Sequence, residues 1–255
     1  MKVTLLAHTA QPEYIVAAAA KLCYSESSAS DLMEGLDDKK AADFVEMLSS
    51  FGHMSPVEHA SFTFAIEGVS RTFLAQITRH RIASFSVQSQ RYVKQKNFIY
   101  ITPPEIEKDE KALEIFNESM QNALDSYNKI ADILSEKYKK EYLAAGMTEK
   151  TADSKAEKKA IEDARFVLPN ACETKMVMTM NARELKHFFN MRCCNRAQWE
   201  IRDVAKEMYR LAYKAAPSIF AKAGPSCVCG KCPEGKMTCG KAEEVRKEYE
   251  AIKNE

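Results

Sequence analysis

Apolar and polar positions recur with two different periods along the chain, and the changes of period predict its elements. Alternating strand patterns occupy residues 1–8, 62–69 and 171–180, and helical patterns occupy residues 12–22, 37–50, 105–143 and 195–216. Ser70 is placed to cap a helix from Arg71 to about Arg79, and Asn181 is placed to cap another that runs toward Asn190. Downstream of the first of these helices, strand-like spacing is shown by Phe85, Val87, Tyr92 and Val93.

Strands and helices are mixed without a regular βαβ alternation, and no Gly-rich dinucleotide fingerprint is present. This order predicts an α+β fold in which a mixed β-sheet packs against long helices, and it argues against a Rossmann-type domain. No linker, repeat or low-complexity tract interrupts the pattern, so we expect a single domain. The Lys-rich stretch 150–159 is predicted to be the solvated face of a helix.

Composition narrows the classes of partner. The net charge is +1 and 45% of the residues are hydrophobic, so the chain has enough apolar side chains for a core and no global attraction to nucleic acid or membrane. The first apolar run, which ends at His8, is too short for a signal peptide, and no run approaches the roughly 20 residues of a membrane span. We therefore expect a cytoplasmic protein with reduced thiols.

A dense cationic stretch is the main candidate for chemistry. Arg79, His80 and Arg81 stand in a row, and Ser89 and Arg91 follow closely. Buried cations are costly unless anions meet them, and the planar guanidinium binds phosphate oxygens in pairs. A solvated basic face is the alternative, but the predicted helix before the stretch and the strand-like spacing after it favour a site for an anionic ligand, preferably phosphate.

Four motifs stand in a characteristic order. They are the G-H-x-S-P-x-E-H pattern at 52–59, the R-H-R-x-x-S pattern from Arg79 that continues into S-x-R-Y, the segment 165–169, and the segment 181–192 with its continuation at 197–201. Together they resemble the flavin-dependent thymidylate synthases from Lys2 to Ala223. That extent implies a domain of residues 1–223 and a Cys-containing C-terminal tail of residues 224–255. Ser86 and Val87 depart from the family's usual Asn and Glu.

The resemblance implies an activity. It is the reductive methylation of dUMP to dTMP, with methylenetetrahydrofolate as carbon donor, reduced FAD as hydride donor and NADPH to regenerate the reduced flavin. No enzyme nucleophile is implied. The resemblance also implies a homotetramer with active sites shared between subunits, with dUMP and folate as small-molecule partners and neither nucleic acid nor membrane.

The resemblance assigns residues to each ligand. For FAD it nominates Ser55, Arg79, His80, Arg81, Val87, Asn181, Arg183 and His187, with His53 nearby. For dUMP it nominates Gln76, Arg79, Val87, Gln88, Ser89, Gln90, Arg91, Arg165 and Arg192. Arg192 is the catalytic candidate, because a guanidinium there would stabilise the ionised uracil ring. Its alternative role is a cation that satisfies carbonyl groups at a helix C-terminus. At Val87 only a backbone role can carry over.

The cysteines offer two further possibilities. Cys172, Cys193 and Cys194 are candidates for a thiol nucleophile, but we favour ordinary buried cysteines. The tail residues Cys227, Cys229, Cys232 and Cys239 resemble a small metal knuckle, yet their spacing is not that of a zinc ribbon. A reduced tail or a disulfide is favoured there, and no metal is assigned.

Two other classes of protein compete with a flavoenzyme. One is a nucleic-acid-binding module that uses Arg79, Arg81 and Arg91 on phosphates, although the net charge of +1 does not favour it. The other is a scaffold built on the Cys tail. A yellow purified protein with an oxidised-flavin spectrum would separate the enzyme from both.

Overall fold

The structure is a computed structural model that describes residues 1–91 and 99–255 of the 255-residue chain. The described chain divides into two compact units. The first unit contains residues 1–67, 75–86 and 176–255, and the second contains residues 68–74 and 87–175. Because residues 176–255 all belong to the first unit, the division does not fall at the predicted boundary after residue 223, which stays a prediction. Tyr92 and Val93 lie outside the described residues.

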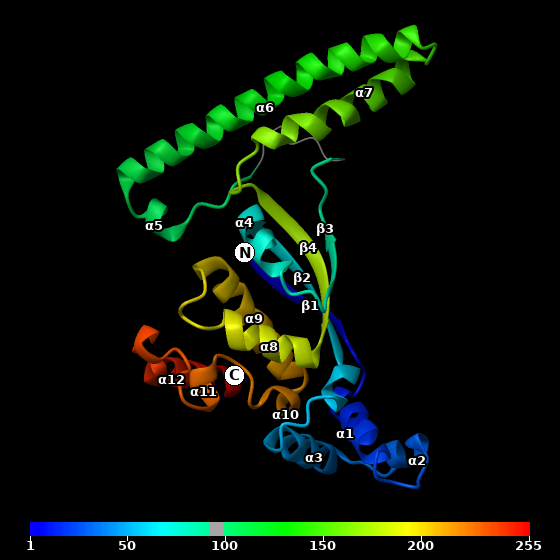
Figure 1. Ribbon diagram of the computed structural model, residues 1–255, viewed down its shortest axis with the longest axis vertical. Helices are drawn as coiled ribbons and strands as arrows, with labels where there is room; N and C mark the ends of the chain where they lie inside the picture. The colour runs from blue at the N-terminus through cyan, green and yellow to red at the C-terminus, as the bar shows by residue number, and fades with distance from the viewer. Residues whose placement is uncertain (92–98) are drawn as a thin grey trace. The chain divides into compact units, whose positions relative to one another are not determined.

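Four strands form an antiparallel sheet in the order β1-β2-β4-β3 (Figure 1). Their bounds are Lys2–His8 for β1, Ser61–Ser70 for β2, Ser84–Val87 for β3 and Glu173–Asn181 for β4. Lys2 lies opposite Glu67 and His8 opposite Phe62, with an irregularity between Leu5 and Ala7. The predicted strands and the α+β class are confirmed, and the sheet is antiparallel rather than mixed.

Most of the helices belong to the first unit. They are α1 Pro12–Leu22, α2 Ala29–Glu34, α3 Asp38–Ser50, η1 Pro56–His59, α8 Ala182–Arg192, α9 Trp199–Ala215, α10 Pro217–Phe220, α11 Ser226–Cys229, η3 Gly235–Met237 and α12 Ala242–Lys253. Helix α9 packs against β1, α8, α10 and α12, so it connects the sheet with the C-terminal helices of this unit (Figure 1).

The core of the first unit follows from strand alternation and aromatic packing. From Phe62 to Ile66 every second side chain of β2 is fully buried, including Phe64. The Phe189 ring from α8 makes edge-on contacts with Tyr209 of α9, at 5.6 Å between centroids, and with Phe220, at 5.9 Å. Burial of such rings contributes most of the packing energy of a small core, and here it fixes α8 against α9.

The predicted capping residues are confirmed. The amide of Phe73 donates to the Ser70 hydroxyl at 3.0 Å, and helix α4 follows over Arg71–Ile77. The amide of Glu184 donates to Asn181 Oδ1 at 2.9 Å and starts α8. Helix α4 ends at Ile77, before the predicted end at Arg79, and that difference releases the cationic stretch into a turn.

A helical hairpin dominates the second unit. Its helices are α5 Pro104–Glu107, α6 Glu110–Ala144, α7 Glu149–Ala164 and η2 Arg165–Val167. The shorter α7 packs against part of α6 (Figure 1). Ala152, Ala156 and Ala160 form a buried stripe on α7, while the lysines of 150–159 are exposed, as predicted. Among the described residues, none of the helices combines the length and the apolar character needed to cross a bilayer.

Candidate active site

The segment from Arg79 to Arg81 leaves the end of α4 in a hydrogen-bonded turn of the first unit. The amide of Arg79 donates to the carbonyl of Gln76 at 3.3 Å, and the amide of His80 donates to the carbonyl of Ile77 at 3.1 Å. Arg79 and Arg81 are exposed, whereas His80 is buried. The turn thus presents two guanidinium groups to solvent and directs the imidazole between them into the protein.

His80 is held at both ring nitrogens by side chains of α8. Its Nδ1 lies 3.2 Å from Glu184 Oε1, and its Nε2 lies 3.2 Å from Arg192 Nε. Because a guanidinium only donates, Nε2 must accept, so the proton of the neutral ring sits on Nδ1 and is donated to Glu184. These hydrogen bonds define both the tautomer and the orientation of the ring.

The surroundings of His80 favour its neutral form. Burial lowers the pKa of His80, the hydrogen bond to Glu184 opposes this effect, and the positive charge of Arg192 adds to it. The ring also meets Phe188 edge-on at 5.0 Å between centroids and lies 6.1 Å from the His187 ring. At neutral pH the imidazole is therefore an uncharged acceptor for Arg192.

Arg192 is the last residue of α8, and its guanidinium is close enough to that of Arg79 for the two positive charges to repel each other. Burial lowers the pKa of Arg192, and the neighbouring Arg79 lowers it further. Within residues 1–91 and 99–255, neither guanidinium forms an ion pair with a carboxylate. Two neighbouring cations without an anion between them constitute a site that an anionic ligand would stabilise.

Gln76, a predicted dUMP ligand, is connected to the start of α9. Its amide nitrogen donates to Gln198 Oε1 at 3.5 Å. The same oxygen accepts from the backbone amides of Glu200, at 3.0 Å, and Ile201, at 3.2 Å, and so caps α9. The role of Gln198 was not predicted, although its place just before a helical pattern is a typical capping signal.

Two predicted flavin ligands already have partners within the first unit. Asn181 uses its Oδ1 to cap α8, and Arg183 forms an ion pair with Glu58 of η1. Both side chains of that pair are about half exposed, so the pair contributes little to stability and a ligand can compete with it. Arg183 and His187 lie one helical turn apart on α8, as the spacing predicted.

Ser55 and His53 lie at another place in the first unit. They line a cavity of about 520 Å³ together with the apolar rings of Phe44 and Phe51. None of the residues from Arg79 to Arg81 lines it. The cavity lined by Ser55 is thus not formed by the cationic turn, whereas His187 and Arg192 both lie near the His80 ring.

The second unit holds its own group of arginines. Arg91 Nε lies 3.6 Å from Glu162 Oε1, and Arg165 Nε donates to the Glu162 carbonyl at 3.1 Å. Burial lowers the pKa of Arg71, and the charge of Arg165 lowers it further. Arg71 was not predicted. Its signal in the sequence is a cation at the first position of a helix, where the helix dipole disfavours positive charge.

The segment after β3 has backbone roles as well as side chains. Val87 ends β3, and the amide of Gln88 donates to the carbonyl of Lys175 at 3.0 Å. The Ser89 hydroxyl accepts from the amide of Arg91 at 3.1 Å. This contact stabilises the turn and does not involve a base that would activate a serine nucleophile.

Two of the three candidate thiols, those of Cys172 and Cys193, are poor nucleophiles. All eight cysteines are unpaired, and both Cys172 and Cys193 are buried. Burial raises the pKa of Cys172 to about 11 and that of Cys193 to about 12. Both therefore remain protonated at neutral pH, when the thiolate is the reactive form.

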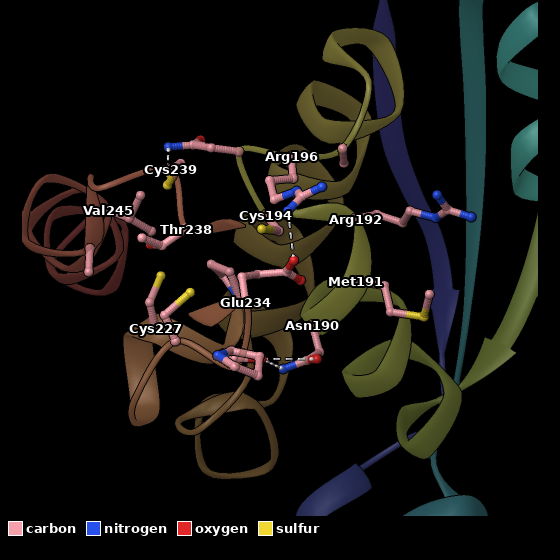
Figure 2. Close-up of a pocket in the computed structure, with 17 residues that line it drawn as sticks. Asn190, Met191, Arg192, Cys194, Arg196, Cys227, Glu234, Thr238, Cys239 and Val245 are labelled. Carbon is pink, nitrogen blue, oxygen red and sulfur yellow. Dashed lines mark hydrogen bonds and ion pairs between the residues drawn. The ribbon is translucent and has the colours of Figure 1, made fainter. Parts of the chain in front are cut away.

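The cysteine-rich tail surrounds a separate cavity of about 250 Å³ in the first unit (Figure 2). The cysteines that line it are Cys194, Cys227, Cys232 and Cys239, so Cys194 takes part and Cys229 does not. Two residues of the cavity lining are joined directly, since Arg196 Nη1 donates to Glu234 Oε2 at 3.0 Å. Among the described residues, no three His, Cys, Asp or Glu side chains are arranged to hold a metal ion. Figure 2 shows the Arg192 side chain pointing away from this cavity.

Arg79 and Arg192 lie close together, without a carboxylate partner among the described residues, and Arg192 contacts the buried neutral His80. An α+β protein with this arrangement belongs to the class of proteins that can bind an anionic ligand and stabilise charge on it. Residues 4–218 match the family model described as thymidylate synthase complementing protein. The match covers most of the chain, so the chain belongs to this family.

Relatives agree with this assignment. The chain is 56% identical to the flavin-dependent thymidylate synthase of Clostridium tetani over 98% of this chain and 97% of that one. It is 47% identical to that of Geobacter sulfurreducens over 97% of each. A crystal structure of the Helicobacter pylori flavin-dependent thymidylate synthase, complexed with FAD and dUMP, matches with a TM-score of 0.62 and 25% identity over 88% of this chain and 100% of that one. The expected activity, a flavin-dependent methyltransferase, is confirmed.

Proposed function

We propose that Arg192 is the residue that activates the uracil ring when dUMP is methylated to dTMP. One observation carries this assignment: the Nε of Arg192 is held by the buried neutral imidazole of His80, while its charge has no carboxylate partner among the described residues. As the ring accepts hydride or loses a proton, negative charge develops on its oxygens and nitrogen. A cation placed in advance stabilises that charge without reorganisation.

In the reaction that we assign, two co-substrates supply what dUMP needs: methylenetetrahydrofolate supplies the carbon and NADPH supplies the reducing electrons. dUMP, methylenetetrahydrofolate, NADPH and a proton give dTMP, tetrahydrofolate and NADP⁺. FAD, when bound, supplies the hydride chemistry that connects NADPH with the pyrimidine. The chain itself binds and orients the reactants and stabilises charge.

Residues of the first unit fit an anionic dinucleotide. From this unit we assign to FAD Arg79, His80, Arg81, Asn181, Arg183 and His187, with Ser55. The backbone of Val87, which is the first residue of a segment of the second unit, is also assigned to FAD. Arg79 and Arg81 are exposed and have no carboxylate partner within the described chain, and a pyrophosphate requires such donors. His80, whose two nitrogens are already engaged, would act by fixing the turn that carries these guanidinium groups.

For the phosphate of dUMP we assign Arg91 and Arg165, with Arg71 added from the structure. Mutual repulsion between Arg71 and Arg165 supports an anion at this place, because a phosphate would relieve it. Ser89 would offer a hydroxyl. The remaining assigned contacts to dUMP are Gln76, Arg79, the backbone of Val87, Gln88 and Gln90.

We further propose that no cysteine adds to the ring. The raised pKa values of Cys172, about 11, and Cys193, about 12, support this route without a thiolate.

We also propose that the protein is a cytoplasmic homotetramer whose active sites are shared between subunits. Apolar side chains such as Tyr24, 88% exposed, and Phe51, 70% exposed, support association between copies of the chain.

The test is release of tritium from dUMP labelled at C5, with methylenetetrahydrofolate and NADPH, in the presence and absence of FAD. We expect release that depends on FAD and dTMP formed in equal amount. Purified protein should be yellow. A colourless protein that forms no dTMP when FAD is added, and that binds DNA with a steep salt dependence, would instead favour a nucleic-acid module.

A further inference from the structure

Three residues of α8 form one stripe that faces His80. Glu184, Phe188 and Arg192 are each four positions apart, so they lie along one side of the helix. Each of them contacts the imidazole: Glu184 at Nδ1, Phe188 edge-on against the ring, and Arg192 at Nε2. The imidazole thus connects the first turn of α8 to its last residue.

We propose that Glu184 is a positioning residue for Arg192 and acts through the tautomer of His80. This inference rests on the proposed role of Arg192. The Glu184 side chain is 11% exposed and the His80 side chain 5%, so their hydrogen bond is shielded from water. A carboxylate only accepts, and it therefore requires the proton on Nδ1. Nε2 is then left as an acceptor for the Nε–H of Arg192.

The other tautomer would break this arrangement. A proton on Nε2 would face the Nε–H of Arg192, and two donors cannot form a hydrogen bond with each other. Protonation of His80 would have the same effect. The groups that act electrostatically on His80 are Glu184, Arg192 and His187, all from α8, and of these only Glu184 is an anion. Glu184, which only accepts, and Arg192, which only donates, both favour the Nδ1–H tautomer, and Glu184 is the partner that does so from outside the chemistry proposed for Arg192.

Glu184→Gln tests the proposal with little change in shape. A carboxamide can donate or accept, so it no longer selects the Nδ1–H tautomer. The cap of α8 is unaffected, because it uses the backbone amide of residue 184. We expect kcat for dTMP formation to fall by roughly ten- to hundredfold, as is typical when an outer partner that orients a functional group is lost. Flavin content should fall less than kcat, because a carboxamide can still form a hydrogen bond with Nδ1 of His80 and so hold the turn that carries Arg79 and Arg81.

The pH profile gives a second readout. The carboxylate of Glu184 raises the pKa of His80 against the effect of burial, so its loss should move protonation of His80 to lower pH. The acid limb of kcat should therefore shift to lower pH while the plateau falls. Glu207→Gln is the control, because Glu207 is a partly buried carboxylate on α9 that pairs with Arg210 and has no role in the proposed site. It should leave both the plateau and the acid limb in place.

A double variant separates this proposal from the proposed function. In an Arg192→Ala background, Glu184→Gln should cause no further loss, since it acts only through Arg192. Equal losses in both backgrounds, or an unshifted acid limb, would overturn the positioning role. Near-normal turnover of Arg192→Ala would instead overturn the role of Arg192. Should Glu184→Gln not yield folded flavoprotein, Glu184→Asp, with a shortened reach, must lose turnover, and full activity in it would refute the proposal.

Discussion

Replacing Gly224 with alanine should detach the C-terminal helix from the first unit. Gly224 has a φ of +116°, a backbone conformation that L side chains rarely adopt. A Cβ at this position would lie 2.8 Å from Cε1 and 3.1 Å from Cδ1 of Tyr249 in α12. The Tyr249 ring is fully buried and lies 4.8 Å from the ring of Tyr209 in α9, so it has no free space to enter.

The size of the effect follows from two terms. Carbon atoms in contact normally lie about 3.5–4.0 Å apart, so the new methyl or the ring must move by roughly 0.7 Å or more. Overpacking of this kind costs about 1–3 kcal/mol. Holding a side chain at the observed φ of Gly224 adds strain of about 1–3 kcal/mol. The free energy of unfolding should therefore fall by roughly 2–6 kcal/mol.

Urea denaturation under reducing conditions measures this change, with tyrosine fluorescence and far-UV circular dichroism as probes. Gly240→Ala is the matched control: its φ is +75° and a Cβ there would meet nothing within 4 Å, so it contains the backbone term alone. Tyr249→Leu should reduce the cost of Gly224→Ala, because it removes the atoms that clash. Equal midpoints for Gly224→Ala and Gly240→Ala would refute the reasoning.

Three further predictions concern the site. Arg192→Ala should lower kcat for dTMP formation by roughly a hundredfold or more with flavin retained, and Arg192→Lys should restore only part of it; near-normal turnover would leave helix capping as the role of this residue. Cys172→Ala and Cys193→Ala should each retain dTMP formation, and complete loss with FAD and dUMP still bound would contradict a route without a thiolate. Because burial lowers the pKa of His80, the unfolded chain takes up this proton first as the pH falls. The contribution of His80 to stability is then complete above about pH 6.5 and is lost below it, and a His80→Gln variant should show a smaller change in urea midpoint between about pH 7.5 and about pH 5.5.

Local signals predicted most of the elements because each depends on residues close together in the sequence. Ser70 and Asn181 cap helices as their positions indicate, and β4 alternates between buried and exposed side chains. Helix α12 was missed, since its buried residues, Val245 and Tyr249, are too few to create a period. This helix is stabilised by packing on α9, and such a contact between distant segments cannot be predicted from the residues of α12 alone.

The candidate site was predicted as a set of residues but not as a set of contacts. The sequence indicated that Arg79, His80 and Arg192 belong to one function. It contained no signal that His80 would meet Glu184, which lies 104 positions away and had no predicted role. Arg71 has a local signal as a cation at the first position of a helix, but its neighbour Arg165 comes from a distant segment, so their proximity could not be predicted. Such pairs are fixed by packing, after the local elements have formed.

Helix α8 shows how one element can satisfy the core and the chemistry together. Leu185 and Phe189, four positions apart, are fully buried, and Phe189 anchors the helix to α9 through Tyr209. The neighbouring stripe carries Glu184 and Arg192, which hold the two sides of one imidazole. A guanidinium that must stabilise charge gains from a rigid support, because its orientation is then settled before the ligand arrives. The aromatic core of the first unit thus serves the site as well as the fold, since it fixes the helix whose last residue is Arg192.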